Sequence, residues 1–445
     1  MKHSISRESA LSLAERMRSG RTTVAVMGAS LERIKALESE VQAFAHFDAA
    51  AALASAQRAD RQRGLVDPPG PLHGLPVAVK DIIDTADFPT EHGGEIFRGR
   101  RPDRDATIVR RLRAAGAIVI GKTVTSQYAL FVPGPTRNPR DLTRTPGGSS
   151  SGSAAAVAAR FVPVALGTQT NASIIRPASY CGIVGFKPSI GVLPRTGVLR
   201  HCALIDHPGA FAGSVADAAF VVDAIAGEDP ADPVSRNLPA ALLDAALDRD
   251  KTPRLAFTLG PFESRAEPAT REAFKSFIAR LPLPVDAIEL GPEFAAAEGT
   301  LRALMCAGVA ESIGRDIDAA VDRVPELVVR LVEEGRALSA VDLLAAWTRR
   351  DRLRSELVAR MSKYAAVLTF ASTGPAPLAS EGTGDPIFAT LWTLIGAPAY
   401  SLPLLRSANG LPIGLQAVGA PAHDVQLTAA AAWLMRAVEN SNPGL

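Results

Sequence analysis

The fold is decided by the stretch from 145 to 178, TPGGSSSGSAAAVAARFVPVALGTQTNASIIRPA. It opens with a Gly- and Ser-rich loop and continues into an Ala-rich segment typical of a helix at 154–160. The apolar residues 164–166 indicate a buried strand, and a second turn follows at 167–173. A flexible linker lacks such a buried-strand pattern, so this stretch is predicted to lie inside a folded core.

The segments on either side of this stretch alternate between strands and helices. Helical spacing over 8–62 predicts an outer helical layer, and further helices are expected from about 105, between about 292 and 361, and from 425. Short apolar runs predict strands at 77–79, 117–120, 255–258, near 287–290, and at 367–370, 400–403 and 412–418. Alternation of this kind is typical of an α/β fold. With no internal repeat and no clear boundary, we expect one domain over 1–445.

Composition excludes several classes of protein. The 48 Lys and Arg nearly balance the 46 Asp and Glu, which gives no global case for binding nucleic acid or an anionic membrane. The three cysteines form no CxxC pair, so neither a disulfide framework nor a structural zinc site is expected. Residues 1–20 lack a continuous apolar stretch, so we expect no signal peptide and no membrane anchor. These features together predict a cytoplasmic protein without a metal.

Lys80 ends the apolar run GLPVAVK at 74–80. An ammonium at the end of a buried strand is disfavoured if water is kept away, so such a lysine can act as a base at neutral pH. The alternative is a strand-end lysine whose side chain reaches solvent.

The two small-residue turns offer hydroxyls and backbone N–H groups. The loop that contains Ser149, Ser150 and Ser151 precedes a helix, where hydroxyls serve as caps or as a proton relay. It lacks the Gly-Lys-Ser/Thr ending of a nucleotide-binding loop. The turn at 167–173 can aim successive N–H groups at one point, as an oxyanion hole requires, with Ser173 beside them. Taken singly, the loop could be an ordinary capped turn and the second turn an ordinary β-turn.

Taken together, these motifs resemble the amidase signature family. GGSSSGSAAA at 147–156, GTQTNASIIRPA at 167–178 and Val79-Lys80-Asp81 match its motifs, and CGIVGFKP at 181–188 and GLPIGLQ at 410–416 agree further along the chain. The resemblance spans nearly the full length and is strongest to malonamidase-type amidases. It implies a large mixed twisted β-sheet covered by helices on both faces, with a signature core at about 70–205, a helical elaboration at about 260–360 and a return to the sheet at about 365–440.

The resemblance also implies a Ser-Ser-Lys triad and hydrolysis of a carboxylic amide through an acyl-enzyme, without a cofactor. Ser173 matches the nucleophile, Lys80 the base and Ser149 the bridging serine, which follows a cis peptide. The backbone N–H groups of Thr170, Asn171, Ala172 and Ser173 would form the oxyanion hole. Arg176, Ser150 and Gln169 would bind substrate, and Arg176 matches the residue that pairs with a free carboxylate in malonamidase-type enzymes.

Two departures from the family pattern concern the second turn, where Asn171-Ala172 replaces Gly-Gly and Gln169 replaces Asp. Ala adopts left-handed backbone angles poorly, so the shape of this turn is open. Arg176 has a structural alternative, which is to tie down the loop at Pro177.

The alternatives for function are an amidotransferase-type or other amide hydrolase that needs a partner subunit, and a non-catalytic amidase-like binding protein. A Ser/His/Asp hydrolase is disfavoured, because none of the seven histidines lies in a Gly-x-Ser-x-Gly context and His207, beside Asp206, is interpreted as a loop residue. A homodimer is also possible from sequence.

Overall fold

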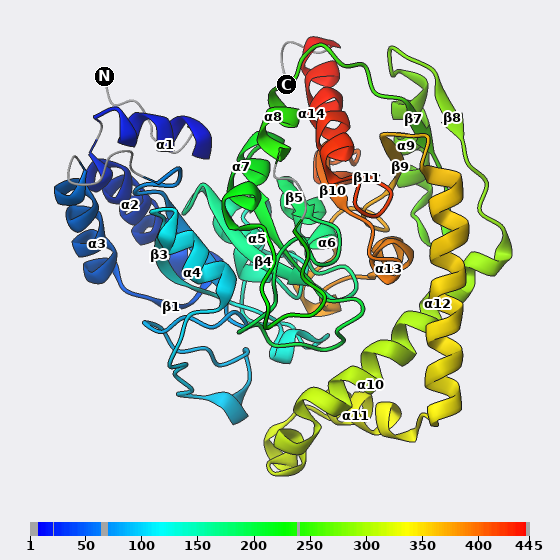
Figure 1. Ribbon diagram of the computed structural model, residues 1–445, viewed down its shortest axis with the longest axis horizontal. Helices are drawn as coiled ribbons and strands as arrows, with labels where there is room; N and C mark the ends of the chain where they lie inside the picture. Colours follow the sequence, from blue (N-terminus) through cyan, green and yellow to red (C-terminus); the bar gives the residue numbers. More distant parts are fainter. Residues whose placement is uncertain (1–7, 21, 64–69, 238–240, 442–445) are drawn as a thin grey trace.

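The computed structural model describes residues 8–20, 22–63, 70–237 and 241–441 (Figure 1). Residues 1–7, which belong to the N-terminal segment predicted to carry no signal, lie outside the described residues.

An 11-stranded mixed sheet forms the centre of the molecule, in the order β1-β3-β2-β4-β6-β5-β10-β11-β9-β7-β8. Strands β3–β2–β4 and β9–β7–β8 are parallel, whereas the other neighbours are antiparallel. The strand bounds are β1 (Phe44–Phe47), β2 (Pro76–Lys80), β3 (Ile118–Thr123), β4 (Val164–Gln169), β5 (Val184–Lys187), β6 (His207–Ala212), β7 (Leu255–Phe257), β8 (Val285–Ala287), β9 (Ala366–Phe370), β10 (Ala399–Arg406) and β11 (Pro412–Val418).

Helices cover both faces of this sheet (Figure 1). On β2, Val77 and Val79 pack into the core with α1, α4, α7 and α14, whereas Ala78 between them packs into the core with α2, α3 and α5. The predicted α/β class, with a mixed sheet between helical layers, is confirmed. The helices are α1 (Ala10–Arg18), α2 (Thr23–Val41), α3 (Ala49–Gln62), α4 (Thr107–Ala114), α5 (Ser151–Ala158), α6 (Ile175–Cys181), α7 (Val215–Ile225), α8 (Leu242–Leu247), α9 (Pro268–Ala279), α10 (Ala297–Asp318), α11 (Glu326–Ala337), α12 (Ala340–Met361), α13 (Ile387–Leu394) and α14 (Asp424–Ser441).

The topology brings two functional segments to the same edge of the sheet. β2 and β4 run parallel with Val79 opposite Leu166, so the carboxyl ends of both strands lie side by side. In open α/β sheets, ligands bind outside the carboxyl ends of parallel strands. Lys80 ends β2 and Gln169 ends β4, which places the two motifs singled out from sequence next to each other.

The strand predictions needed four corrections. Within the region predicted to be helical, 44–47 forms β1 at the edge of the sheet; Ala45 is exposed and the other three residues are half-buried, so the strand has no buried face to signal it. The strand expected near 287–290 lies at Val285–Ala287. Strands β5 and β6 were not predicted, because Gly185, Pro208 and Gly209 interrupt their apolar patterns. His207 is wrong as a loop residue, since it opens β6 and pairs with Gln169 of β4.

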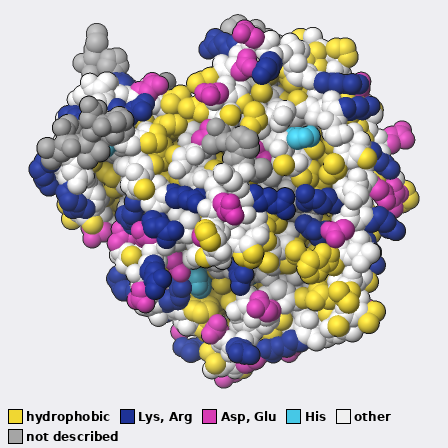
Figure 2. All heavy atoms as spheres, viewed as in Figure 1, with side chains coloured by type: hydrophobic (Ala, Val, Ile, Leu, Met, Phe, Trp, Pro, Cys, Tyr) yellow, Lys and Arg dark blue, Asp and Glu magenta, His cyan; other side chains and the backbone are white. Residues whose placement is uncertain are grey.

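The surface agrees with the near-balance of charge in the sequence. Figure 2 shows basic and acidic side chains interspersed on the face that it draws. None of the helices among the described residues is long and apolar enough to cross a bilayer.

Candidate active site

The amine of Lys80 lies in the interior at the end of β2. Its side chain is 0% exposed, and Nζ hydrogen-bonds to Ser149 Oγ at 2.7 Å and to Thr168 Oγ1 at 2.9 Å. Burial lowers the pKa of Lys80 well below its usual value, and the negative charge of Asp206 opposes this. A buried amine with a lowered pKa is a proton acceptor at neutral pH. Of the two sequence interpretations of Lys80, the structure supports burial rather than a reach to solvent.

The Ser149 loop holds its three serines in different environments. The Gly148–Ser149 peptide is cis, as the resemblance implies, and Ser149 contacts Lys80. Ser150 Oγ instead donates to Thr168 O at 3.2 Å and accepts from Thr168 N at 3.3 Å. Ser151 begins α5, and its hydroxyl donates to Val124 O at 3.2 Å. Ser149 is therefore the member of this run in contact with the amine.

Ser173 lies just before α6, in a segment that packs against the Ser149 loop. A Cβ added at Gly147 would lie 2.9 Å from the Cα of Pro177, so only glycine lets these two segments approach so closely. Exposure rises from 0% at Lys80 through 3% at Ser149 to 9% at Ser173. Ser173 is thus the most exposed of the three candidate catalytic residues.

The turn at 170–173 departs from the family pattern without backbone strain. Neither Asn171 nor Ala172 has a positive φ, so this conformation does not require glycine at either position. The Asn171 side chain gains one contact that glycine could not make, because its Oδ1 accepts from Thr390 Oγ1 at 2.8 Å. The backbone carbonyl of Asn171 accepts from Thr393 Oγ1 at 2.6 Å. Both threonines belong to α13. The turn therefore accommodates Asn171 and Ala172 without a left-handed backbone angle at either residue.

Gln169 has a structural task in the same turn. Its Oε1 accepts from the N–H groups of Ile174 and Ile175 at 2.8 and 3.0 Å, and so satisfies donors at the start of α6. Its Nε2 donates to Thr393 Oγ1 at 2.8 Å. Gln169 and Ser150 were both expected to bind substrate, but the hydrogen bonds that their side chains form are to other residues of the protein.

Arg176 points into the protein and is 3% exposed. Its guanidinium donates to Gly148 O at 2.7 Å, to Thr383 Oγ1 at 3.2 Å and to Gly384 O. These contacts favour the structural alternative for Arg176, because they tie α6 to the carbonyl of the cis peptide and to the segment before α13.

An open cavity of about 540 Å³ borders this segment. Thr383 and Gly384 line it together with Phe131 and Tyr180, and a Cβ added at Gly148 would lie 2.8 Å from the Thr383 methyl group. The cavity therefore reaches to within one side chain of the Gly148–Ser149 peptide.

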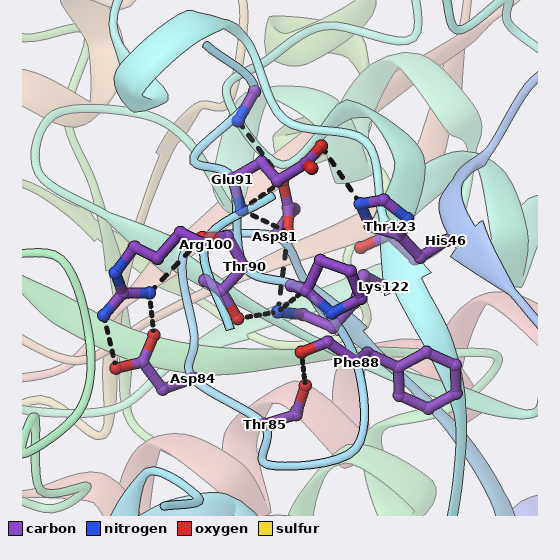
Figure 3. A network of polar contacts seen from close by, with 12 residues as sticks. His46, Asp81, Asp84, Thr85, Phe88, Thr90, Glu91, Arg100, Lys122 and Thr123 are labelled. Atoms are coloured by element: carbon purple, nitrogen blue, oxygen red, sulfur yellow. Dashed lines mark hydrogen bonds and ion pairs between the residues drawn. The ribbon is translucent and has the colours of Figure 1, made fainter. Parts of the chain in front are cut away.

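A buried ionic network anchors the segment that follows Lys80 (Figure 3). Lys122 Nζ lies 3.5 Å from Asp81 Oδ1 and donates to Thr90 Oγ1 at 2.5 Å, with both charged side chains almost fully buried. Asp81 accepts from the N–H groups of Glu91 and Gly93. Burial lowers the pKa of Lys122 to about 8, and Asp81 opposes this.

Further ion pairs of the network join the two ends of the segment 84–100 and link that segment to β1. Arg100 forms a bidentate pair with Asp84, at 2.7 and 3.0 Å, and His46 Nε2 lies 3.1 Å from Glu91 Oε2 (Figure 3). The residues from Asp84 to Arg100 are thereby fastened onto the ends of β2 and β3. This network holds the backbone that follows Lys80, beginning at Asp81.

Sequence reasoning missed three residues that contact the site. Thr168 follows Leu166 at the end of β4, so its place next to the end of β2 would have followed from pairing these strands. Asp206 accepts from Thr170 Oγ1 at 2.6 Å, and Thr393 contacts both Gln169 and Asn171. Asp206 lies 36 residues from Thr170 in the sequence, and Thr393 lies 222 residues from Asn171, so no local sequence pattern predicts these contacts.

Among the described residues, no group of three or more His, Cys, Asp or Glu side chains is arranged to hold a metal ion. The site instead collects an amine, hydroxyls and backbone N–H groups. That set suits nucleophilic attack by a serine with proton transfer to a neutral amine.

Comparison with known proteins agrees with this chemistry. Residues 25–428 match the amidase family. The chain is 35% identical to a glutamyl-tRNA(Gln) amidotransferase subunit of Salinispora arenicola, with 98% of each chain covered, and 34% identical to the corresponding subunit of Chloroflexus aggregans, with 91% of each covered.

Solved structures show the same fold. The peptide amidase from Stenotrophomonas maltophilia superposes with a TM-score of 0.81 at 30% identity, covering 97% of this chain and 96% of that one. A 6-aminohexanoate cyclic dimer hydrolase complexed with substrate gives a TM-score of 0.86 at 25% identity, with 97% of each chain covered. The chain belongs to the amidase family, and it is an amide hydrolase.

Proposed function

We propose that this protein hydrolyses a carboxylic amide to an acid and ammonia or an amine through Ser173, Ser149 and Lys80. The observation that carries the proposal is the contact of 2.7 Å between the buried amine of Lys80 and the hydroxyl of Ser149. Ser149 is the second residue of a cis peptide, and the carbonyl of Gly148 in that peptide accepts from Arg176, three residues after Ser173.

The proposed reaction begins with a proton relay. Neutral Lys80 takes the proton of Ser149, Ser149 takes that of Ser173, and Ser173 Oγ attacks the amide carbon. The N–H groups of Asn171, Ala172 and Ser173 stabilise the oxyanion, since no hydrogen bond within the described part of the chain occupies them. The relay then returns a proton through Ser149 to the departing nitrogen, which leaves an acyl group on Ser173. Water, deprotonated by the same relay, releases the acid.

The identity of the amide is a separate proposal. The resemblance to malonamidase-type enzymes suggests a short amide with a free carboxylate, but the contacts of Arg176 do not support its binding that carboxylate. We propose that Arg176 instead positions the Gly148–Ser149 peptide, and that substrate approaches through the cavity lined by Phe131, Tyr180 and Thr383.

A screen of ammonia release tests this function. Short amides with and without a free carboxylate are assayed with the native chain, and the Ser173→Ala variant serves as blank. We expect release from at least one amide with the native chain only. Equal release by both proteins would refute the role of Ser173.

A second candidate is an amide-hydrolysing subunit that acts with a partner, because several relatives are amidotransferase subunits. In that case the chain alone would be nearly inactive, and release of ammonia from glutamine would appear on mixing with a small partner subunit. Full activity of the purified chain alone would favour the first candidate. The alternative of a non-catalytic binding protein does not agree with the family match and with the amide-hydrolysing structural neighbours.

A further inference from the structure

A buried carboxylate, Asp206, lies behind the turn that carries the proposed oxyanion hole. It immediately precedes β6, whose first residue His207 pairs with Gln169 at the end of β4. This pairing brings Asp206 to Thr170, the first residue of the turn. The mechanism described above assigns Asp206 no role.

Three donors converge on the carboxylate of Asp206. Thr170 Oγ1 donates to Oδ1 at 2.6 Å, and the N–H groups of His201 and Cys202 donate to Oδ2 at 2.7 and 2.8 Å. Hydrogen bonds to an ionised acceptor are about twice as strong as those between neutral groups. Asp206 therefore holds Thr170 from one side of the turn, while α13 holds Asn171 from the other.

Asp206 also lies close to the residue that contacts the amine. Thr168, which hydrogen-bonds to Lys80 at 2.9 Å, lines a small cavity together with Thr170 and Asp206. The charge of Asp206 raises the pKa of Lys80 and so opposes the larger effect of burial.

The other ionisable groups around this pair do not duplicate the charge of Asp206. His201 also interacts with Lys80, and burial lowers its pKa, so it is neutral at neutral pH. Burial raises the pKa of the Cys202 thiol to about 12. Arg195 lines a small cavity with Asp206, but its guanidinium is paired with Asp232 at 2.6 Å. Among the described residues, Asp206 is thus the carboxylate whose charge acts on Lys80.

We propose that Asp206 is a positioning residue for amide hydrolysis: its carboxylate fixes Thr170 at the start of the oxyanion turn and supplies the negative charge opposite Lys80. The inference rests on the proposed function, because it assumes that Lys80 is the base. It assigns two separable effects to one side chain, on the geometry of the turn and on the protonation of the amine.

The charge effect is tested by the pH profile of kcat/KM for Asp206→Asn. Activity requires neutral Lys80 and is lost as pH falls through the pKa of the amine. Without the anion that pKa falls further, so we expect the acid limb to move down by about 1 pH unit or more. Asp217→Asn is the matched control: Asp217 is also buried, at 2% exposure against 7% for Asp206, and accepts from Leu11 N at 2.9 Å, but it lies on α7 and the charge that acts on Lys80 is that of Asp206. Its acid limb should stay in place.

Variants of Thr170 test the positioning effect. They also keep the proposal testable if the Asp206→Asn variant does not fold. Thr170→Val removes the hydroxyl and should lower kcat by roughly tenfold to a hundredfold without moving the acid limb. Thr170→Ser keeps the hydroxyl and should restore most of kcat.

Two results would overturn the proposal. One is an unmoved acid limb in folded Asp206→Asn, and the other is equal kcat in Thr170→Val and Thr170→Ser. Failure of the proposed function would look different, since the Ser173→Ala blank would then turn over as fast as the native chain.

Discussion

Removing the hydroxyl of Ser149 separates the relay from every other contribution to the site. In the Ser149→Ala variant, Lys80 keeps its hydrogen bond of 2.9 Å to Thr168 but loses the contact of 2.7 Å that links it to the serines. Positioned proton transfer contributes about 10²–10⁴ to a rate. We therefore expect kcat to fall by that factor, which corresponds to about 3–5 kcal/mol of transition-state stabilisation.

Ser150→Ala is the matched control for Ser149→Ala. Ser150 is the next residue, is also buried, and contacts the backbone of Thr168 rather than Lys80. Its loss should cost about 0.5–1.5 kcal/mol of stability and less than about tenfold in kcat. Both variants are measured by steady-state ammonia release, with urea unfolding as a check on folding. If Ser150→Ala lost more activity than Ser149→Ala, the relay through Ser149 would be refuted.

Three further predictions concern the supports of the site. Gln169→Leu leaves buried N–H groups at the start of α6 unsatisfied, so it should lower kcat at least about tenfold and lower the free energy of urea unfolding by about 1–3 kcal/mol. Gln169→Glu keeps the acceptor and should recover part of both losses. Equal kinetics for the two variants would contradict the capping role of Gln169. Lys122→Met leaves the carboxylate of Asp81 buried without its cation, so the free energy of unfolding should fall by about 3–5 kcal/mol. The control Lys275→Met breaks an exposed pair with Glu263 and should lower it by less than about 1 kcal/mol. Similar losses in the two variants would show that the buried network is not important for stability. Burial lowers the pKa of Lys187 from 10.5 to about 7, so the unfolded chain binds more protons than the folded chain between these values and stability should rise with pH there. From pH 7 to 9 the native protein should gain roughly 2 kcal/mol relative to Lys187→Met in urea unfolding, and parallel pH curves would contradict the shift.

The fold was predictable where the chain carries its own local signal. The loop at 147–153, the helix after it and the strand Val164–Gln169 follow one another in a pattern that indicates an α/β core. Strands β5 and β6 gave no such signal, because they are formed by pairing with distant strands and contain glycines at close contacts. At Gly185, for example, an added Cβ would lie 2.5 Å from the Ala178 methyl group. The organisation of 1–445 as one domain stays a prediction.

The candidate site divides in the same way. Lys80, Ser149 and Ser173 could be proposed from sequence because each lies in a short motif, and Lys80 hydrogen-bonds to Ser149 in the structure. Asp206 and Thr393 reach the turn from the start of strand β6 and from helix α13, so tertiary pairing alone brings them there. The doubt about Asn171-Ala172 came from backbone preferences, and the structure shows that neither residue has a positive φ angle. The oxyanion hole at this turn stays a prediction. The catalytic roles themselves stay predictions until they are measured.

The central claim is that Ser173 is the nucleophile and that Lys80 activates it through Ser149. Labelling with a fluorophosphonate, followed by peptide mass spectrometry, tests it most directly. The account predicts one adduct, on Ser173, which forms at least about 10²-fold more slowly in Lys80→Ala and in Ser149→Ala. An adduct on Ser149 or Ser150, or unchanged labelling of Ser173 in Lys80→Ala, would contradict it.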